Sequence, residues 1–237
     1  MKAKPSMVWM GTAMVALMLG FILFQVSFAD KEESEHVWSF DKNAVGSVPK
    51  GWKVAETAGQ GTPATWRVVA DTTAPSPPNA MAITANKNYG HTFNLLIAKD
   101  TSYKDLEIEV MVKAGTGEDD QGGGPIWRAQ DADNYYIARW NPLEDNFSVY
   151  FVKKGNRKRL ANAKVKADPN AWHEIEIEHE GNEIKAKFDG KKLIEVKDAT
   201  FPEAGMVGLW TKADAATAFD DFKVEAKDLE EEENDRD

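Results

Sequence analysis

The residues best suited to chemistry are three glutamates in the segment HEIEIEHE, residues 173–180. Glu174, Glu176 and Glu178 alternate with isoleucines, so in a β-strand all three share one face. Two carboxyl groups about 5 Å apart are what retaining hydrolysis of a glycosidic bond requires. The alternative is an amphipathic strand whose isoleucines face the core while the carboxylates face water. The same alternation of glutamates with apolar residues recurs at Glu107 and Glu109. The carboxylates to test, if the chain is an enzyme, are Glu107, Glu109, Glu174 and Glu176.

Two arginines form a second candidate site. If residues 131–134 are the loop of a hairpin, Arg128 lies opposite Ile137 and shares one face with Tyr135 and Arg139. Arginine donates planar, bidentate hydrogen bonds to vicinal hydroxyls or carboxylates, and a neighbouring aromatic ring can stack on a sugar. The alternative is a pair of structural ion pairs with Glu107, Glu109 or Asp131. The residues predicted to bind a glycan are Arg128, Tyr135, Arg139, Trp66 and Trp210.

The same hairpin predicts part of the core. Trp127, Tyr136 and Trp140 would share the face opposite the arginines, and an aromatic face of this kind belongs to a hydrophobic interior. A shift of the hairpin by one residue would exchange the two faces.

A structural cation is a third candidate. Asp41, Asp220 and Asp221 come together if the terminal strands pair, and carboxylate oxygens suit Ca²⁺. No other cofactor is expected. The four histidines lack the spacing of metal ligands, and we expect them at the surface or in packing.

Composition excludes several other sites. The chain has no cysteine, so disulfides, thiolate metal sites and a cysteine nucleophile are excluded. The triple glycine 122–124 precedes a strand, whereas phosphate binding uses the start of a helix. Formal net charge is −10, and residues 228–237 hold seven acidic residues and one Arg. This acidity argues against nucleic acid as a partner.

The N-terminus predicts export. Lys2 and Lys4 precede an uncharged stretch with an apolar centre at residues 7–24, and Ser27-Phe28-Ala29 fits a signal-peptidase site. The stretch is also long enough to span a bilayer, so a retained anchor is the alternative and the only expected membrane contact. We therefore predict a signal peptide or anchor at 1–29, a spacer at 30–36, one domain at 37–226 and a disordered acidic tail at 227–237. The predicted location is the periplasm or the medium.

The rest of the chain predicts β-structure. In residues 106–113, Leu106, Ile108, Val110 and Val112 alternate with polar residues or methionine, as in a half-buried antiparallel strand. Asp189-Gly190 between two alternating runs predicts a two-residue hairpin turn. About a dozen short strands and no sustained helical period predict an all-β sandwich. The final run FDDFKVE should lie beside the first strand, residues 36–40, and so protect an edge.

Four segments resemble the concanavalin A-like lectin/glucanase superfamily, with laminin G-like and 3-keto-disaccharide hydrolase-type domains as its closest members: GGPIWRAQDADNYYIARW, FSVYFVKKGNRKRLA, AWHEIEIEHEGNEIKAKFDGKKLIEV and GMVGLWTKADAATAFDDFKVEA. The resemblance covers residues 37–226 and implies a jelly roll of two antiparallel sheets with one concave face. The glutamate strand also resembles the acidic strand of laminarinase-type glycoside hydrolases, but Glu176 replaces the middle Asp and the preceding residues do not match.

Such folds serve hydrolases, lectins and adhesion modules alike. The leading hypothesis is an exported, non-catalytic module that binds a glycan on the concave face. The alternatives are a glycoside or 3-keto-disaccharide hydrolase and a structural module of the cell envelope. The sequence does not define an oligomeric state.

Overall fold

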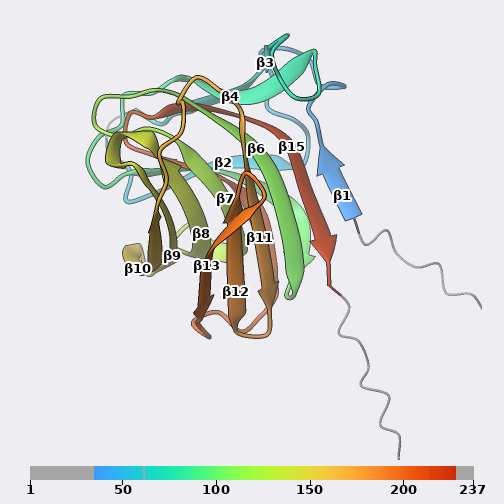
Figure 1. Cartoon of the computed structure of the whole chain (residues 1–237). Coiled ribbons are helices and arrows are strands. Elements are labelled where there is room, and N and C mark those ends of the chain that lie inside the picture. The colour runs from blue at the N-terminus through green and yellow to red at the C-terminus, as the bar shows by residue number, and fades with distance from the viewer. Residues whose placement is uncertain (1–34, 61, 228–237) are drawn as a thin grey trace, which may run out of the picture. The chain divides into compact units, whose positions relative to one another are not determined.

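The computed structural model describes residues 35–60 and 62–227, which form two antiparallel β-sheets packed face to face (Figure 1). The predicted all-β sandwich is therefore confirmed. The predicted leader, residues 30–34 of the spacer and residues 228–237 of the tail lie outside the described residues. The predicted domain boundaries stay a prediction. In the described part of the chain, no helix is long and apolar enough to cross a membrane.

Sheet A has the strand order β13-β12-β11-β6-β15-β4-β3, and β1 also pairs with β15. Its strands are β1 (Glu35–Trp38), β3 (Thr65–Ala70), β4 (Asn79–Ala85), β6 (Leu106–Thr116), β11 (His173–Glu180), β12 (Glu183–Phe188), β13 (Lys191–Lys197) and β15 (Ala216–Ala226).

Sheet B has the strand order β10-β9-β8-β7-β14-β5-β2. Its strands are β2 (Trp52–Thr57), β5 (Phe93–Tyr103), β7 (Gly123–Asp131), β8 (Asn134–Asn141), β9 (Asn146–Lys153), β10 (Asn156–Lys164) and β14 (Gly205–Lys212). A single 3-10 turn, η1 (Pro142–Glu144), is the only helical element in the described residues.

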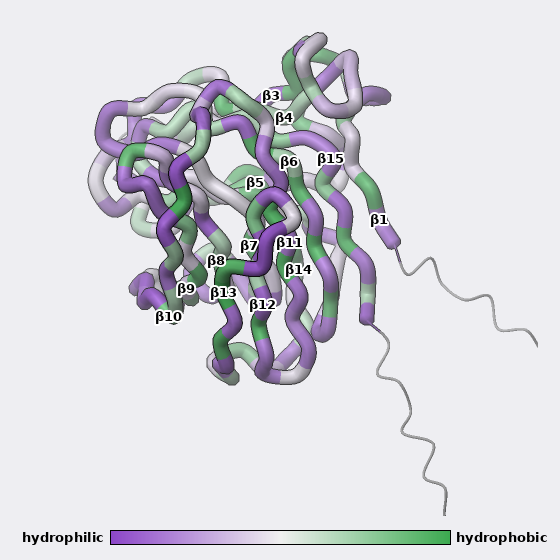
Figure 2. The backbone as a smooth tube through the Cα atoms, in the orientation of Figure 1, coloured by the Kyte–Doolittle hydropathy of each residue, from purple (hydrophilic) through white to green (hydrophobic). Residues whose placement is uncertain are grey.

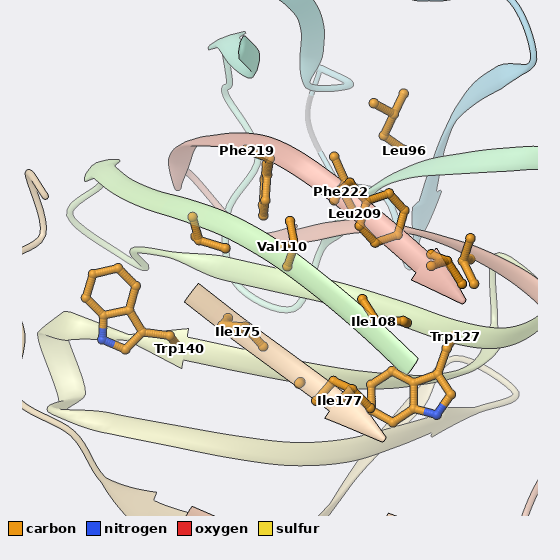
Figure 3. Packing of buried hydrophobic residues seen from close by; sticks show 14 of the residues in the cluster. Leu96, Ile108, Val110, Trp127, Trp140, Ile175, Ile177, Leu209, Phe219 and Phe222 are labelled. Atoms are coloured by element: carbon orange, nitrogen blue, oxygen red, sulfur yellow. The ribbon is translucent and has the colours of Figure 1, made fainter. Parts of the chain in front are cut away.

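Residue alternation fixes which face of each strand is buried. Figure 2 shows hydrophobic and hydrophilic residues alternating along β6 and β15. The apolar residues of β6 and β11 meet those of β7, β8 and β14 between the sheets, where Ile108, Ile177 and Trp127 lie close together (Figure 3). Full burial of each such side chain stabilises the fold by about 1.5–3 kcal/mol. Trp127, Tyr136 and Trp140 are all completely buried in this core, as predicted.

Two local predictions are confirmed, the turn at Asp189-Gly190 and the pairing of the last strand with the first. Asp189 and Gly190 have positive φ of 48° and 71° and turn the chain from β12 to β13. Residues 181–182 turn it from β11 to β12. The last strand, β15, pairs antiparallel with the first, β1, so the two ends of the domain close sheet A.

The predicted register of the β7–β8 hairpin is wrong beyond its tip. Asp131 pairs with Asn134 at the turn, but Trp127 pairs with Tyr136, so β7 carries extra residues in a bulge. Arg128 sits in this bulge with a left-handed φ of 44°. A bulge re-aims side chains relative to the regular alternation. Arg128 therefore leaves the face that it was predicted to share with Arg139.

Candidate functional site

Sheet B curls so strongly that its outer face is itself partly a hydrophobic interior. Arg157 lies on the edge strand β10, yet its guanidinium is 5.0 Å from the ring of Phe93 on β5, on the other side of the sheet. We call this surface the concave face. Nine residues on it form a buried cluster separate from the sandwich core, the concave cluster: Phe93, Leu95, Ile97, Ile126, Ala129, Tyr135, Ile137, Val152 and Trp210.

Arg157 covers one end of the concave cluster. Its guanidinium carbon is 4.5 Å from the ring centre of Tyr150 and 5.7 Å from that of Trp210, besides its contact with Phe93. Attraction between a cation and an aromatic face strengthens when water is excluded. Burial lowers the pKa of Arg157, and repulsion from Arg139 acts in the same direction. A half-buried cation therefore lies on an aromatic floor.

A buried ion-pair network lies beside this floor. Arg139 projects from β8 and donates a hydrogen bond of 2.5 Å from Nη2 to Asp120 Oδ1. Lys212 from the end of β14 donates to Asp120 Oδ2 at 2.7 Å. The Arg139 and Asp120 side chains are only 2% and 1% exposed, and that of Lys212 is 15% exposed. One carboxylate thus neutralises two cations away from water.

The loop that carries Asp120 is fixed from behind. Asp214 accepts hydrogen bonds from three successive backbone N–H groups, those of Glu118, Asp119 and Asp120. Burial acts to raise the pKa of Asp214, but these hydrogen bonds outweigh it and lower the pKa. Asp214 therefore positions the Asp120 carboxylate in front of Arg139.

Glu144 and Tyr150 complete the polar rim. Glu144 accepts a hydrogen bond of 2.7 Å from Asn146 and lies 3.7 Å from Arg139 Nη1, with its side chain 54% exposed. Burial acts to raise the pKa of Tyr150, but Ser148 and the charges of Arg157 and Arg139 lower it below the usual value for tyrosine. The rim therefore offers hydrogen-bond donors and acceptors around a tyrosine hydroxyl.

Several buried polar atoms at this site have no hydrogen-bond partner among the described residues. They are Arg139 Nε, Arg157 Nη1, Asn146 Oδ1 and Trp210 Nε1. Buried polar groups in native proteins are nearly always hydrogen-bonded, since an unpaired one costs about 1–3 kcal/mol. Of these four residues Arg157 lines a cavity of about 440 Å³, together with Phe93, His91 and Asn156. A cavity with convergent polar groups is typical of a ligand site.

The structure separates the residues predicted to bind a glycan. Tyr135, Arg139 and Trp210 do lie on the concave face, but the two aromatic rings are completely buried in the concave cluster. Tyr135 contacts Thr57 through its hydroxyl at 2.7 Å, and burial raises its pKa. Trp66 belongs to the sandwich core, 5.9 Å from Phe219, so its predicted role at a surface is wrong.

Arg128 is likewise a structural residue. It is completely buried, and its guanidinium donates to the carbonyls of Lys104, Phe201 and Gly181 and to Asp105 Oδ1. The alternative of a structural ion pair was correct in kind for Arg128, although Asp105 is the partner rather than Glu107, Glu109 or Asp131.

The four candidate catalytic carboxylates gather on the outer face of sheet A, away from the concave face. Glu109 lies opposite Glu176 across β6 and β11. Burial raises the pKa of Glu174, and Glu176 and Glu109 raise it further. Three of the four carboxylates have lysine partners: Lys187 with Glu176 at 2.7 Å, Lys227 with Glu107 at 2.5 Å and Lys223 with Glu109 at 3.6 Å.

The predicted calcium site does not form in the described residues, where no three acidic or histidine side chains could hold a metal ion. Asp41 accepts a hydrogen bond from the backbone of Asn79. Asp220 accepts from Ser76 N at 2.9 Å, and Asp221 accepts from Ser76 Oγ at 2.6 Å. The three aspartates therefore serve to anchor loops.

The sequence analysis assigned none of five residues to the concave site: Asp120, Glu144, Tyr150, Arg157 and Lys212. Tyr150 lies two residues before Val152 on β9 and so shares its face, but Arg157 lies on β10, where no strand was predicted. The pairing of Asp120 with Arg139 could not be predicted from strand alternation, because Asp120 lies in a loop.

Comparison with known proteins agrees with this fold. Residues 39–225 match the model of a family described as a 3-keto-alpha-glucoside-1,2-lyase-like domain. A levanase of Bacillus subtilis (strain 168) is 27% identical over 140 residues, which cover 58% of this chain and 20% of the levanase. The match thus spans about a fifth of the length of that relative.

Two solved structures show the same architecture. The carbohydrate binding module CBM66 from Bacillus subtilis has a TM-score of 0.58 and 21% identity, covering 74% of this chain and 96% of the module. A Bacillus licheniformis beta-glucanase has a TM-score of 0.53 and 12% identity, covering 82% of this chain and 98% of the glucanase. The predicted concanavalin A-like lectin/glucanase fold is confirmed.

Proposed function

The chain belongs to the 3-keto-alpha-glucoside-1,2-lyase-like domain family, and from this premise we propose that it is a module that binds a glycan on the concave face of sheet B without cleaving it. The observation that carries the proposal is the set of unpaired buried polar atoms beside an aromatic floor and a cavity of about 440 Å³. Sugars present hydroxyl groups and apolar C–H faces on the same ring, so they need both kinds of surface.

The accessible groups of the site have the direct roles in this proposal. Glu144, which is 54% exposed, accepts hydrogen bonds from sugar hydroxyls, and Lys212, which is 15% exposed, donates them, while the buried pair of Arg139 and Asp120 positions both groups. Phe93, which is almost fully buried but lines the cavity, supplies the apolar contact. The similar levanase and the CBM66 module are carbohydrate-related by name, which supports a glycan as the ligand.

A binding assay on the full chain tests the proposal. Isothermal titration against a panel of oligosaccharides should identify a ligand, and Glu144→Gln and Lys212→Gln should each weaken its binding by about tenfold, as loss of a charged hydrogen bond does. Lys187→Gln on the outer face of sheet A is the matched control and should bind normally. Absence of any glycan ligand, or equal binding by all variants, would contradict the proposal.

A second candidate function is cleavage of a 3-keto glycoside on the outer face of sheet A. The observation that favours it is the cluster of carboxylates on β6 and β11, where Glu109 pairs with Glu176 and where burial, and then Glu176 and Glu109, raise the pKa of Glu174. A pair of carboxyl groups with different pKa values is what general acid and base catalysis uses. A turnover assay with a 3-keto-disaccharide is the test. Activity that Glu174→Gln abolishes would establish this function, and absence of turnover would exclude it.

Export is part of the proposal. The basic start, the apolar stretch and Ser27-Phe28-Ala29 favour the periplasm or the medium as the location. Cell fractionation and the N-terminal sequence of the purified protein test it. A mature chain starting at Asp30 is expected, and recovery of the chain from the cytoplasm would contradict it.

A further inference from the structure

The charges at the concave site do not balance. Asp120 and Glu144 face Arg139 and Lys212, and both of these cations lie within 4.0 Å of one or other of the two carboxylates. Arg157 is the remaining cation. Among the described residues, no carboxylate lies within 4.0 Å of its guanidinium, although Asp120 and Glu144 are near enough to stabilise its charge weakly.

Burial makes this imbalance costly. The Nη1 atom of Arg157 is buried and has no hydrogen-bond partner in the described part of the chain. Aromatic faces attract the cation but cannot accept its N–H groups as an oxygen does. A desolvated guanidinium is stabilised most by a carboxylate, which matches its planar donors with two oxygens.

The position of Arg157 makes its unpaired guanidinium available to a ligand in the cavity. Arg157 pairs with Val152 of β9, which belongs to the concave cluster, and Arg157 itself lines the cavity of about 440 Å³. The next residue, Lys158, pairs with Phe151 and points to the opposite face of β10. An anion in the cavity therefore meets Arg157 but not Lys158.

We propose that the ligand is an acidic glycan and that Arg157 binds its carboxylate group, as in a hexuronic acid residue. The inference rests on the proposed glycan-binding function and narrows it to one class of sugar. The aromatic floor holds the guanidinium of Arg157 in place, Arg157 binds the carboxylate from the wall of the cavity, and the rim around Glu144 and Lys212 contacts the hydroxyls of the sugar.

Matched ligands isolate the charge. The full chain is titrated with uronic acid oligosaccharides, namely oligogalacturonate, oligoglucuronate and oligomannuronate, and with the methyl ester of each, which has the same sugar without the negative charge. Neutral xylo- and fructo-oligosaccharides and a sulfated galactan oligosaccharide complete the panel. At least one acid should bind about tenfold more tightly than its ester, as expected for a charge-assisted hydrogen bond.

Variants then locate the effect. Arg157→Gln should bind acid and ester equally, and Arg157→Lys should keep part of the preference because it keeps the charge but loses the fork. Lys158→Gln should keep all of it. Thermal unfolding of each variant verifies that it is folded.

The outcomes separate the two proposals. Binding of neutral oligosaccharides that depends on Glu144, without preference for an acid, would overturn the acidic-ligand inference and leave glycan binding intact. Tighter binding of the sulfated sugar than of every uronate would overturn the assignment to a carboxylate. A preference that survives in Arg157→Gln would overturn the role of Arg157, and absence of binding to any oligosaccharide would overturn both proposals.

Discussion

Asp120→Asn should destabilise the protein strongly, because one buried carboxylate balances two cations. The variant keeps the size of the side chain but removes the charge that Arg139 and Lys212 share at 2.5 and 2.7 Å. Removing one partner of a buried ion pair costs about 3–5 kcal/mol. Lys212 is 15% exposed and can regain water, so its loss of a partner costs little. Arg139 is only 2% exposed and cannot, so most of the cost comes from this one cation, and we expect the lower end of the range.

The assay is urea unfolding followed by tryptophan fluorescence, since seven of the eight tryptophans lie in the described part of the chain. A loss of about 3 kcal/mol corresponds to a decrease in Tm of about 6–12 °C for a domain of this size. Glu195→Gln is the matched control, because it breaks the exposed pair with Lys192 and should leave stability unchanged. A double-mutant cycle with Arg139→Met adds a second test. Arg139→Met removes the buried cation that Asp120→Asn leaves unpaired, so the double variant should lose less stability than the sum of the two single variants.

A destabilisation below about 1 kcal/mol would refute the reasoning, because it would place Asp120→Asn among ordinary surface substitutions. Additive effects of Asp120→Asn and Arg139→Met would do the same, since independent residues add.

Three further predictions concern buried groups of the sandwich. Arg128→Met should cost about 3–5 kcal/mol in urea unfolding, since it leaves Asp105 as an unpaired buried charge, but should not change glycan affinity. Burial and then Asp221 raise the pKa of Asp220 to about 6, so the folded protein gains stability as pH falls from about 6 to 4, by up to roughly 3 kcal/mol. Asp220→Asn should remove this gain in unfolding curves recorded across that range. Burial and then Arg128 lower the pKa of His179 to about 3, so stability falls as pH drops below about 6.5, and NMR should show this ring neutral at pH 5. A titration of His179 near pH 6.5 would contradict its burial.

The fold could be predicted because its determinants are local. The alternation of Leu106, Ile108 and Val110 defines one face of a strand whatever lies elsewhere in the chain, and these residues are buried in the core. Asp189-Gly190 requires positive φ at both positions, which is also a local property.

The site could be predicted only in part because it depends on distant contacts. The bulge at Arg128 changes the register through a left-handed backbone conformation with φ of 44°. The sequence does not predict this conformation, because arginine has no preference for positive φ. Curling of sheet B buries Tyr135 and Trp210 on a face that alternation alone marks as exposed. Arg139 needs Asp120, whose place is fixed by Asp214 from another loop.

The contrast between the two outer faces explains why pairing, rather than residue type, identifies the site. On sheet A, Glu107, Glu109 and Glu176 are among the predicted catalytic carboxylates, but each is matched by a lysine from a neighbouring strand or from the residue that follows β15. Such cross-strand pairs stabilise any charged sheet face and require no ligand. On the concave face, Arg157 has a buried N–H group that no described residue satisfies. Because an unmatched buried cation is costly in the free protein and not in a complex with an anion, the free energy of binding should concentrate at Arg157.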